Sequence, residues 1–228
     1  MTAAVHGQRA GWLLLIPCLA AAAAAAEPAE IRARFIGNMA VQLTDGRVTL
    51  RTDFPYESGY SGYMSWTDAL VPAAAGEALC LVTHSHRDHF LAGLAPRYCQ
   101  KLAGPADVTA ALRGRALPMG LTVVFGAILV TPLATPHARL EHYSYRVEWS
   151  GLRFYFTGDT EDPGELLRQR DLDAAFVSPW LLRSATQAGR RIDARRVVVY
   201  HHEKDESVPE IQRRELPRQG DELVFRKQ

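Results

Sequence analysis

Cysteine and net charge are scarce in this sequence. Only three of its 228 residues are cysteine, and 26 basic residues stand against 25 acidic ones. The first 26 residues contain Arg9 and no acidic residue, so the remaining chain has 25 charged residues of each sign. Nucleic-acid-binding proteins usually gather positive charge on one face, and nothing in this balance requires a nucleic-acid partner. The charged fraction of 22% also argues against extended disorder.

A long apolar run, GWLLLIPCLAAAAAAA, occupies most of the first 26 residues and ends in small residues before Glu27. A charged start, an apolar centre and an Ala-x-Ala exit define a secretory signal peptide, and a membrane-spanning helix needs about 20 apolar residues. We expect residues 1–26 to be a signal peptide and residues 27–228 to be an exported domain, periplasmic or extracellular, with no membrane partner after cleavage. An uncleaved anchor helix is one alternative. A lipid anchor at Cys18 is another, which Pro17 fits poorly.

The exported part retains two cysteines, Cys80 and Cys99. Cys80 lies in an apolar, strand-like run, which favours a buried free thiol. An oxidising compartment would also allow the two to pair, so a disulfide is the alternative.

The order of secondary-structure signals favours one α/β domain without repeats or linkers. Short strands joined by turns such as Asp45-Gly46 come first, and strands alternating with helices follow. This order predicts two mixed β-sheets flanked by helices, a four-layer αββα sandwich. We expect strands within 31–52, 78–83, 97–102, 121–133, 143–149, 152–158, 173–178, 196–200 and 221–227, helices at 88–94, 105–115 and 164–172, and a long aromatic loop at 54–66.

The segment THSHRDHF is the strongest functional signal. It places His84, His86, Asp88 and His89 within six residues, directly after an apolar strand. Imidazole and carboxylate groups bind zinc and similar divalent metals. On a loop leaving a strand, His84 and His86 can point one way and the other two toward a second position. The segment therefore offers two pairs of ligands for two adjacent metals.

Three further residues follow apolar strands: His137, Asp159 and His201. Each alone has an ordinary explanation, as a structural or exposed histidine or as a turn aspartate. Beside the histidine cluster, the two histidines become candidate ligands and Asp159 a candidate bridge between two metals.

This ordered set, HxHxDH, a later histidine, a strand ending in Gly-Asp and a late histidine, resembles the motifs of the metallo-β-lactamase superfamily. The likeness spans residues 31–203, and the opening FIGNMAVQLTDGRVTLRTDFP looks like the first hairpin of the branch that includes ascorbate-phosphate lactonases. The resemblance implies two divalent metal ions, with zinc expected and manganese or iron as alternatives. His84, His86 and His137 would hold one metal, Asp88, His89 and His201 the other, and Asp159 would bridge them.

The resemblance also implies supporting residues. Asp53 would brace the histidine loop. His142 would support the site, face the substrate or lie on the surface. We prefer His201 to its neighbour His202 as the ligand because VVxYH matches the pattern of the family at this strand end, and we expect His202 to support the site or face the substrate.

One departure bears on the activity. True metallo-β-lactamases lack the bridging aspartate, so Asp159 argues against a β-lactamase and favours ester, lactone, thioester, amide or phosphoester hydrolysis. The expected mechanism uses a hydroxide held by two metals, with Asp88 and Asp159 fixing the metals and taking up the proton of the water. No Ser/His/Asp motif suggests covalent catalysis. An iron-dependent redox enzyme, such as a sulfur dioxygenase, and a non-catalytic metal-binding protein are the alternatives.

The substrate is expected to be a small molecule, and the oligomeric state is open. Aromatic residues of the long loop could line its pocket or simply pack over the sheet edge, as could Trp180. Three cations near the ligands could meet an anionic substrate, although solvation is the ordinary fate of each. The loop residues are Tyr56, Tyr60, Tyr63, Met64 and Trp66, and the cations are Arg87, Arg139 and Lys204.

Overall fold

The computed structural model describes residues 30–110, 114–211 and 213–227. The signal peptide expected over residues 1–26 lies outside the described residues. Within them, no helix is both long enough and apolar enough to cross a membrane.

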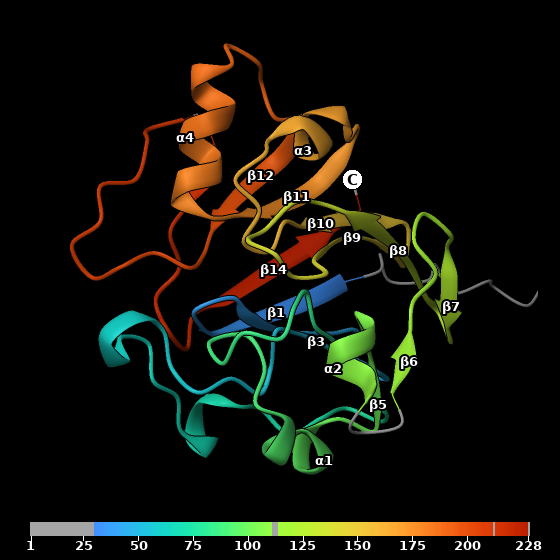
Figure 1. The fold of residues 1–228 in the computed structure, drawn as a ribbon. Helices are drawn as coiled ribbons and strands as arrows, with labels where there is room; N and C mark the ends of the chain where they lie inside the picture. Colours follow the sequence, from blue (N-terminus) through green and yellow to red (C-terminus); the bar gives the residue numbers. More distant parts are fainter. Residues whose placement is uncertain (1–29, 111–113, 212, 228) are drawn as a thin grey trace, which may run out of the picture.

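Two β-sheets pack face to face, each with seven strands in the described part of the chain (Figure 1). In each sheet, four consecutive strands alternate in direction and the following strands run parallel. The first sheet has the order β14-β1-β2-β3-β4-β5-β6, and the second has the order β13-β12-β11-β10-β9-β8-β7. The strands of the first sheet are β1 Glu30–Gly37, β2 Ala40–Thr44, β3 Thr49–Thr52, β4 Ala78–Leu81, β5 Lys101–Gly104, β6 Arg115–Ala116 and β14 Glu222–Arg226. Those of the second are β7 Val123–Phe125, β8 Ile128–Ala134, β9 Tyr143–Trp149, β10 Leu152–Phe156, β11 Leu172–Val177, β12 Ala194–Val199 and β13 Arg214–Glu215.

The main hydrophobic core lies between the sheets, where Phe35 and Leu43 of the first sheet join Phe156 and Phe176 of the second in one buried cluster. Helices cover the two outer faces (Figure 1). The expected four-layer αββα sandwich is therefore confirmed. The helices are α1 Ala95–Tyr98 and α2 Ala106–Ala110 on the first sheet, and α3 Gly164–Arg168 and α4 Pro179–Gln187 on the second.

Several predicted boundaries are wrong. The strand expected over 97–102 is divided, because Pro96 starts the short helix α1 and β5 begins only at Lys101. The helix expected over 105–115 ends earlier, since Arg115 already belongs to β6. Helix α4 was not predicted at all. The strands expected over 143–149 and 152–158 pair as a hairpin, and the turn between them is Ser150-Gly151. Both turn residues have positive φ, 52° and 76°, as a two-residue hairpin turn of type I′ requires.

The two cysteines form a disulfide, so the expected free thiol at Cys80 is wrong. Cys80 lies on β4 and Cys99 directly follows α1, with their Cα atoms 5.6 Å apart. The chain leaves β4 through the histidine segment and returns through α1 to the neighbouring strand β5. The disulfide therefore closes the base of the loop that carries His84 to His89.

Candidate metal centre

The seven predicted metal ligands lie together at one edge of the two sheets. The segment His84–His89 leaves the first sheet after β4, whereas His137, Asp159 and His201 follow β8, β10 and β12 of the second sheet. In each of two groups, the candidate ligand atoms all lie within 4.8 Å of one another. The first group is His84, His86, His137 and Asp159, and the second is Asp88, His89, Asp159 and His201.

In the first group, three imidazole nitrogens converge. His86 Nδ1 lies 3.0 Å from His84 Nε2 and 3.4 Å from His137 Nε2. Asp159 Oδ2 lies 3.8 Å from both Nε2 atoms. Because His84 Nδ1 is 3.1 Å from the Thr83 hydroxyl, its Nε2 presents a lone pair to the group. Lone pairs facing each other at such distances require a proton or a cation between them, so the arrangement suits a metal.

In the second group, carboxylates and imidazoles alternate. Asp88 Oδ2 lies 3.1 Å from His201 Nε2 and 3.5 Å from His89 Nε2. Asp159 reaches both histidines, with Oδ2 3.2 Å from His89 Nε2 and Oδ1 3.5 Å from His201 Nε2. Asp159 is thus the one residue shared by the two groups, as a bridging carboxylate would be.

Burial and missing partners indicate that these atoms fit a cation. His89 is fully buried and Asp159 is 8% exposed. Among the described residues, His89 Nε2 and Asp159 Oδ1 are buried atoms without a hydrogen bond of good geometry. Buried polar atoms without partners are costly, and a divalent ion would satisfy both. Imidazole and carboxylate donors suit zinc, manganese and iron.

The electrostatics also favour a cation. Burial raises the pKa of Asp88, but the imidazoles of His201 and His89 lower it by more, so the net shift is downward. Burial likewise raises the pKa of Asp159, which His89 and His201 lower by more. Burial lowers the pKa of His84. At neutral pH the carboxylates are therefore ionised and His84 is neutral, as metal binding needs. His89 differs, because the carboxylates of Asp159 and Asp53 outweigh its burial and raise its pKa, so a cation at its Nε2 would have to displace a proton.

Comparison with solved structures assigns the architecture. The chain matches Igni18, a metallo hydrolase from Ignicoccus hospitalis, with a TM-score of 0.67 and 14% identity over 87% of this chain and 100% of that one. It matches the metallo-beta-lactamase fold protein YhfI from Bacillus subtilis with a TM-score of 0.64 and 13% identity over 86% and 99% of the two chains. The chain has the metallo-β-lactamase fold.

A third structural match is a protein with a different chemistry. CmlA, a diiron beta-hydroxylase from Streptomyces venezuelae, matches with a TM-score of 0.54 and 16% identity, over 77% of this chain and 45% of that one. No protein-family model and no curated protein matches the sequence significantly. At these identities, the metallo-β-lactamase fold is what the likeness shows.

Within this fold, Asp53 contacts the histidine segment at Thr83 and His89 and holds it in place. The fully buried carboxylate accepts hydrogen bonds from the backbone and hydroxyl of Thr83, at 2.7 and 3.0 Å, and lies 3.2 Å from His89 Nδ1. A donor at Nδ1 leaves Nε2 of His89 free for the centre. Asp53 follows β3 with a φ of 44°, a strained conformation for a non-glycine residue that turns its side chain under the loop.

His142 supports Asp159 through the backbone. Its Nε2 accepts a hydrogen bond from the Asp159 N–H at 2.9 Å, so its Nδ1 carries the proton and donates to Thr135 Oγ1 at 2.8 Å. From there the hydrogen bonds continue through Ser144 to the Thr157 carbonyl. Burial lowers the pKa of His142 to about 3. His142 is thus a buried, neutral positioning residue, and its occupied Nε2 is not available to a metal or a substrate.

His201, and not its neighbour, lies in the cluster. The ring of His202 lies 5.9 Å from the ring of Tyr63, and its Nδ1 is 3.0 Å from the Glu203 carbonyl. His201 has a φ of 50°, which turns its ring toward Asp88. Its backbone N–H donates to the Asn38 carbonyl at 2.8 Å.

Asn38, in the turn between β1 and β2, is not among the predicted site residues. Its side-chain amide donates to the Asp88 carbonyl at 2.8 Å while its own carbonyl accepts from His201. It therefore joins the ligand loops of the two sheets. An asparagine in a turn beside β1 carried no signal of this role, because both partners are distant in sequence.

A cavity of about 500 Å³ opens beside the second group, lined by Asp88, His201, Tyr60, Trp180, Arg183 and Glu206 among others. Of the loop aromatics, Tyr60 lines this cavity and is 70% exposed. Tyr56 is fully buried, and Trp66 packs against it. Most of the loop therefore packs over the sheet edge, and Tyr60 is the member that faces the cavity.

The nearby cations differ in their surroundings. The guanidinium of Arg87 is neutralised by Glu57, at 2.6 and 2.7 Å, on the surface. Arg139 and Lys204 are exposed. In the cavity wall, Arg183 pairs with Glu206 at 2.7 Å. The ring of Trp180 lies 4.9 Å from the His201 ring, and its indole N–H donates to the Thr160 carbonyl. Trp180 therefore forms part of the cavity wall and does not project into the site.

Proposed function

We propose that this chain is an exported, metal-dependent hydrolase that binds two divalent cations and cleaves an ester-, lactone- or phosphoester-type bond in a small molecule. One observation carries the proposal: two groups of imidazole and carboxylate atoms share Asp159 and border a cavity of about 500 Å³. Zinc is the cation we favour because three histidines meet in the first group.

The residues divide the work. His84, His86 and His137 would hold one cation, and Asp88, His89 and His201 the other, with Asp159 between them. Two such cations supply Lewis acidity, which lowers the pKa of water and polarises the bond to be cleaved. Asp88, partly exposed beside the cavity, is positioned to take up the proton that the attacking water loses.

The cavity provides a place for the rest of the substrate. Tyr60 offers an exposed aromatic face, and the wall behind it is closed by Trp180 and by the Arg183–Glu206 ion pair. Since Arg183 is already neutralised, the wall has little net positive charge to hold a second anionic group. This favours substrates whose non-reacting part is neutral.

The test is a screen of the zinc-loaded and manganese-loaded protein against lactones, esters, thioesters, phosphodiesters and β-lactams. We expect turnover of at least one carbonyl or phosphoryl class and none by His86→Ala. The neighbouring pair His201→Ala and His202→Ala is compared by metal content, because both residues line the cavity. His201→Ala should lose a cation and His202→Ala should keep both, and equal loss of metal in the two variants would contradict the assignment of His201.

The CmlA match makes an iron redox enzyme the competing function, because its fold is shared and these ligands also suit iron. Metal analysis of protein purified without added metal separates the two. Stoichiometric iron together with substrate-dependent oxygen consumption would refute the hydrolase proposal.

A further inference from the structure

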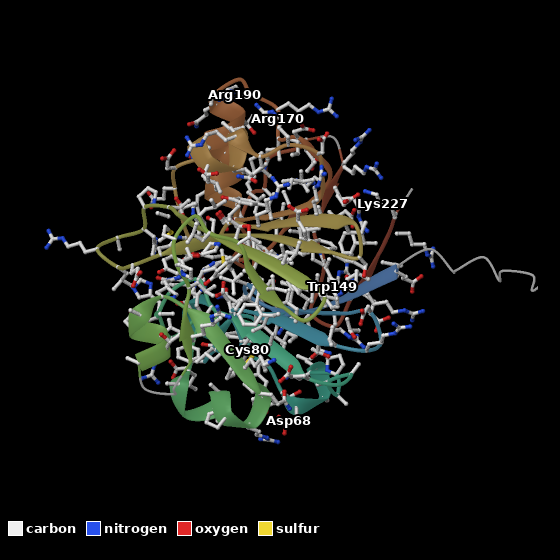
Figure 2. The ribbon with its side chains drawn as sticks, turned by 90° about the vertical axis from the view of Figure 1, so that its right-hand side faces the viewer. Asp68, Cys80, Trp149, Arg170, Arg190 and Lys227 are labelled. Atoms are coloured by element: carbon white, nitrogen blue, oxygen red, sulfur yellow. A yellow bond between two sulfur atoms is a disulfide. The ribbon has the colours of Figure 1, made fainter. Side chains whose placement is uncertain are left out.

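A band of positive charge lies at the edge of the second sheet opposite the metal centre. The metal ligands follow the carboxyl ends of β10 and β12, whereas this band lies around the amino ends of β10 to β13. Figure 2 shows three of its members on one face of the molecule. We call this band the basic edge and define it as Arg170, Arg190, Arg191, Arg213 and Lys227.

No carboxylate neutralises these five cations within the described part of the chain. Arg170, Arg190 and Lys227 donate only to backbone carbonyls. The side chains of Arg191 and Arg213 make no ion pair or hydrogen bond with the residues described. Other arginines nearby do have acidic partners, as Arg153 has Asp171, Arg195 has Asp173 and Arg196 has Glu215.

The groove beside the basic edge contains one carboxylate without an ion pair among the described residues, Asp193. Five cations against this one leave about four uncompensated positive charges. The whole chain has a formal net charge of only +1. Folding therefore separates charge that is balanced along the sequence, which is why composition did not reveal this surface.

Exposed apolar residues lie at the same edge. Val124 and Leu129 are cross-strand partners beside the tip of the β7–β8 hairpin, and they are 59% and 39% exposed. The register Ile128↔Trp149 and Leu152↔Trp149 puts this tip at the edge where β10 begins. Cationic side chains next to exposed aliphatic ones are typical of surfaces that rest on a lipid bilayer.

The chain enters the fold at this edge as well. Glu30, the first described residue, is the register partner of Arg226, the residue before Lys227. The apolar run in the first 26 residues ends four residues before Glu30. Four peptide units span at most about 14 Å. As long as that run is uncleaved and lies in a bilayer, the basic edge is within reach of the headgroups.

We propose that the basic edge and the β7–β8 hairpin dock on anionic phospholipid headgroups and leave the metal centre facing the aqueous side. Guanidinium groups bind phosphate through paired, charge-assisted hydrogen bonds. Each basic residue near an anionic surface strengthens binding about fivefold. The sequence predicts no membrane partner once the signal peptide is cleaved. The proposal departs from that expectation because of the charge separation, and it does not depend on the proposed hydrolase activity.

The test is co-sedimentation of the full chain with vesicles of phosphatidylcholine alone or mixed with phosphatidylglycerol. We expect tighter binding to the mixed vesicles, weakened by salt because exposed charges are screened. The double variant Arg191→Glu/Arg213→Glu should bind the mixed vesicles at least 25-fold more weakly. The control Lys204→Glu/Arg218→Glu changes the charge equally at the opposite edge and should bind within twofold of the unaltered chain.

Three outcomes would overturn the proposal: equal binding to both kinds of vesicle, equal losses in the two double variants, or tighter binding to a DNA duplex than to the mixed vesicles.

A second variant, Val124→Ser/Leu129→Ser, tests the hairpin without changing charge. It should weaken vesicle binding several-fold while the salt dependence stays the same. Unchanged binding would show that the hairpin is not part of the docking surface. Thermal unfolding and zinc content are measured for each variant to verify that the variant is folded.

Discussion

The two sheets contribute to the metal centre in different ways. The first sheet supplies four candidate ligands from one loop, His84 to His89, whose base is closed by a disulfide. The second supplies one residue from each of three loops, His137, Asp159 and His201. Neither sheet alone completes a group of donors. The difference shows that a dense local motif provides most of the candidate ligands, whereas the packing of the sheets decides whether they come together.

The residues that support the candidate ligands also differ between the two sheets. On the first sheet, the Asp53 carboxylate acts directly on the ring of a ligand, 3.2 Å from His89 Nδ1. On the second, His142 acts on the backbone of Asp159 through a neutral hydrogen bond. Charge-assisted hydrogen bonds are roughly twice as strong as neutral ones, so the first contact should matter more. The following changes test this comparison, from the largest expected effect to the smallest.

Asp159→Ala should have the largest effect, because this second-sheet residue belongs to both groups. We expect loss of both metal ions and a fall in kcat/KM of about 10³-fold, the scale on which groups stabilising developing charge contribute. His86→Ala removes a residue of the first group alone and should leave one metal bound. Metal content by mass spectrometry distinguishes the variants, and two ions retained in Asp159→Ala would refute the shared role.

Gly158→Ala should destabilise the second-sheet side of the centre by about 3 kcal/mol. Gly158 has a φ of +60°, and an added Cβ would lie 2.3 Å from His142 Nε2 and 3.0 Å from Thr83 Cβ. Gly126→Ala is the control, since Gly126 has a φ of +59° with nothing within 4 Å, and it should cost only about 1 kcal/mol of backbone strain. Urea unfolding of both variants measures the difference. Equal costs would mean that no close approach exists at Gly158.

Asp53→Asn should weaken zinc binding about 10- to 100-fold, the usual effect of removing a carboxylate that orients a ligand. The amide keeps the shape but loses the charge that holds the proton on His89 Nδ1. Asp45→Asn alters a carboxylate of the same sheet in the β2–β3 turn and should leave the affinity unchanged. Competition with a chromogenic chelator gives both constants.

His142→Asn should have the smallest effect, weakening zinc binding about fivefold, because a neutral hydrogen bond contributes about 1 kcal/mol. The same competition assay applies. A loss as large as that of Asp53→Asn would reverse the order of importance proposed for the two supports.

Much of the fold could be predicted from local pattern. The hairpin at Ser150-Gly151 and the strands around it follow from turn chemistry and apolar runs, which act over a few residues. The wrong boundaries lie in short segments whose local sequence is compatible with either a strand or a helix. Arg97 lies in a run that resembles a strand, yet Pro96 and the return toward β5 make it helical.

Some residues of the candidate metal centre could likewise be predicted from local sequence, and others could not. The sequence identified His84 to His89 because four potential ligands within six residues rarely occur by accident. It marked His137, Asp159 and His201 as candidates because each follows an apolar strand, and the resemblance then assigned them to two metals. Asn38 and the orientation of His142 could not be found, because their partners lie in other loops and a hydrogen bond has no sequence period. The disulfide was only the less favoured alternative for the same reason: pairing depends on a Cα separation that only the fold defines.

By itself, the sequence determined the chemistry available to this protein: two mixed sheets and a set of imidazole and carboxylate groups, each placed at the end of a strand by short-range preferences. The tertiary structure decided which of these groups meet. It brought the single residues of the second sheet to the loop of the first, chose His201 over His202 for the cluster, and gathered basic residues at the opposite edge. The physical reason is that residue type and turn preference act locally, whereas the distance between groups far apart in the chain is set by how the two buried faces pack.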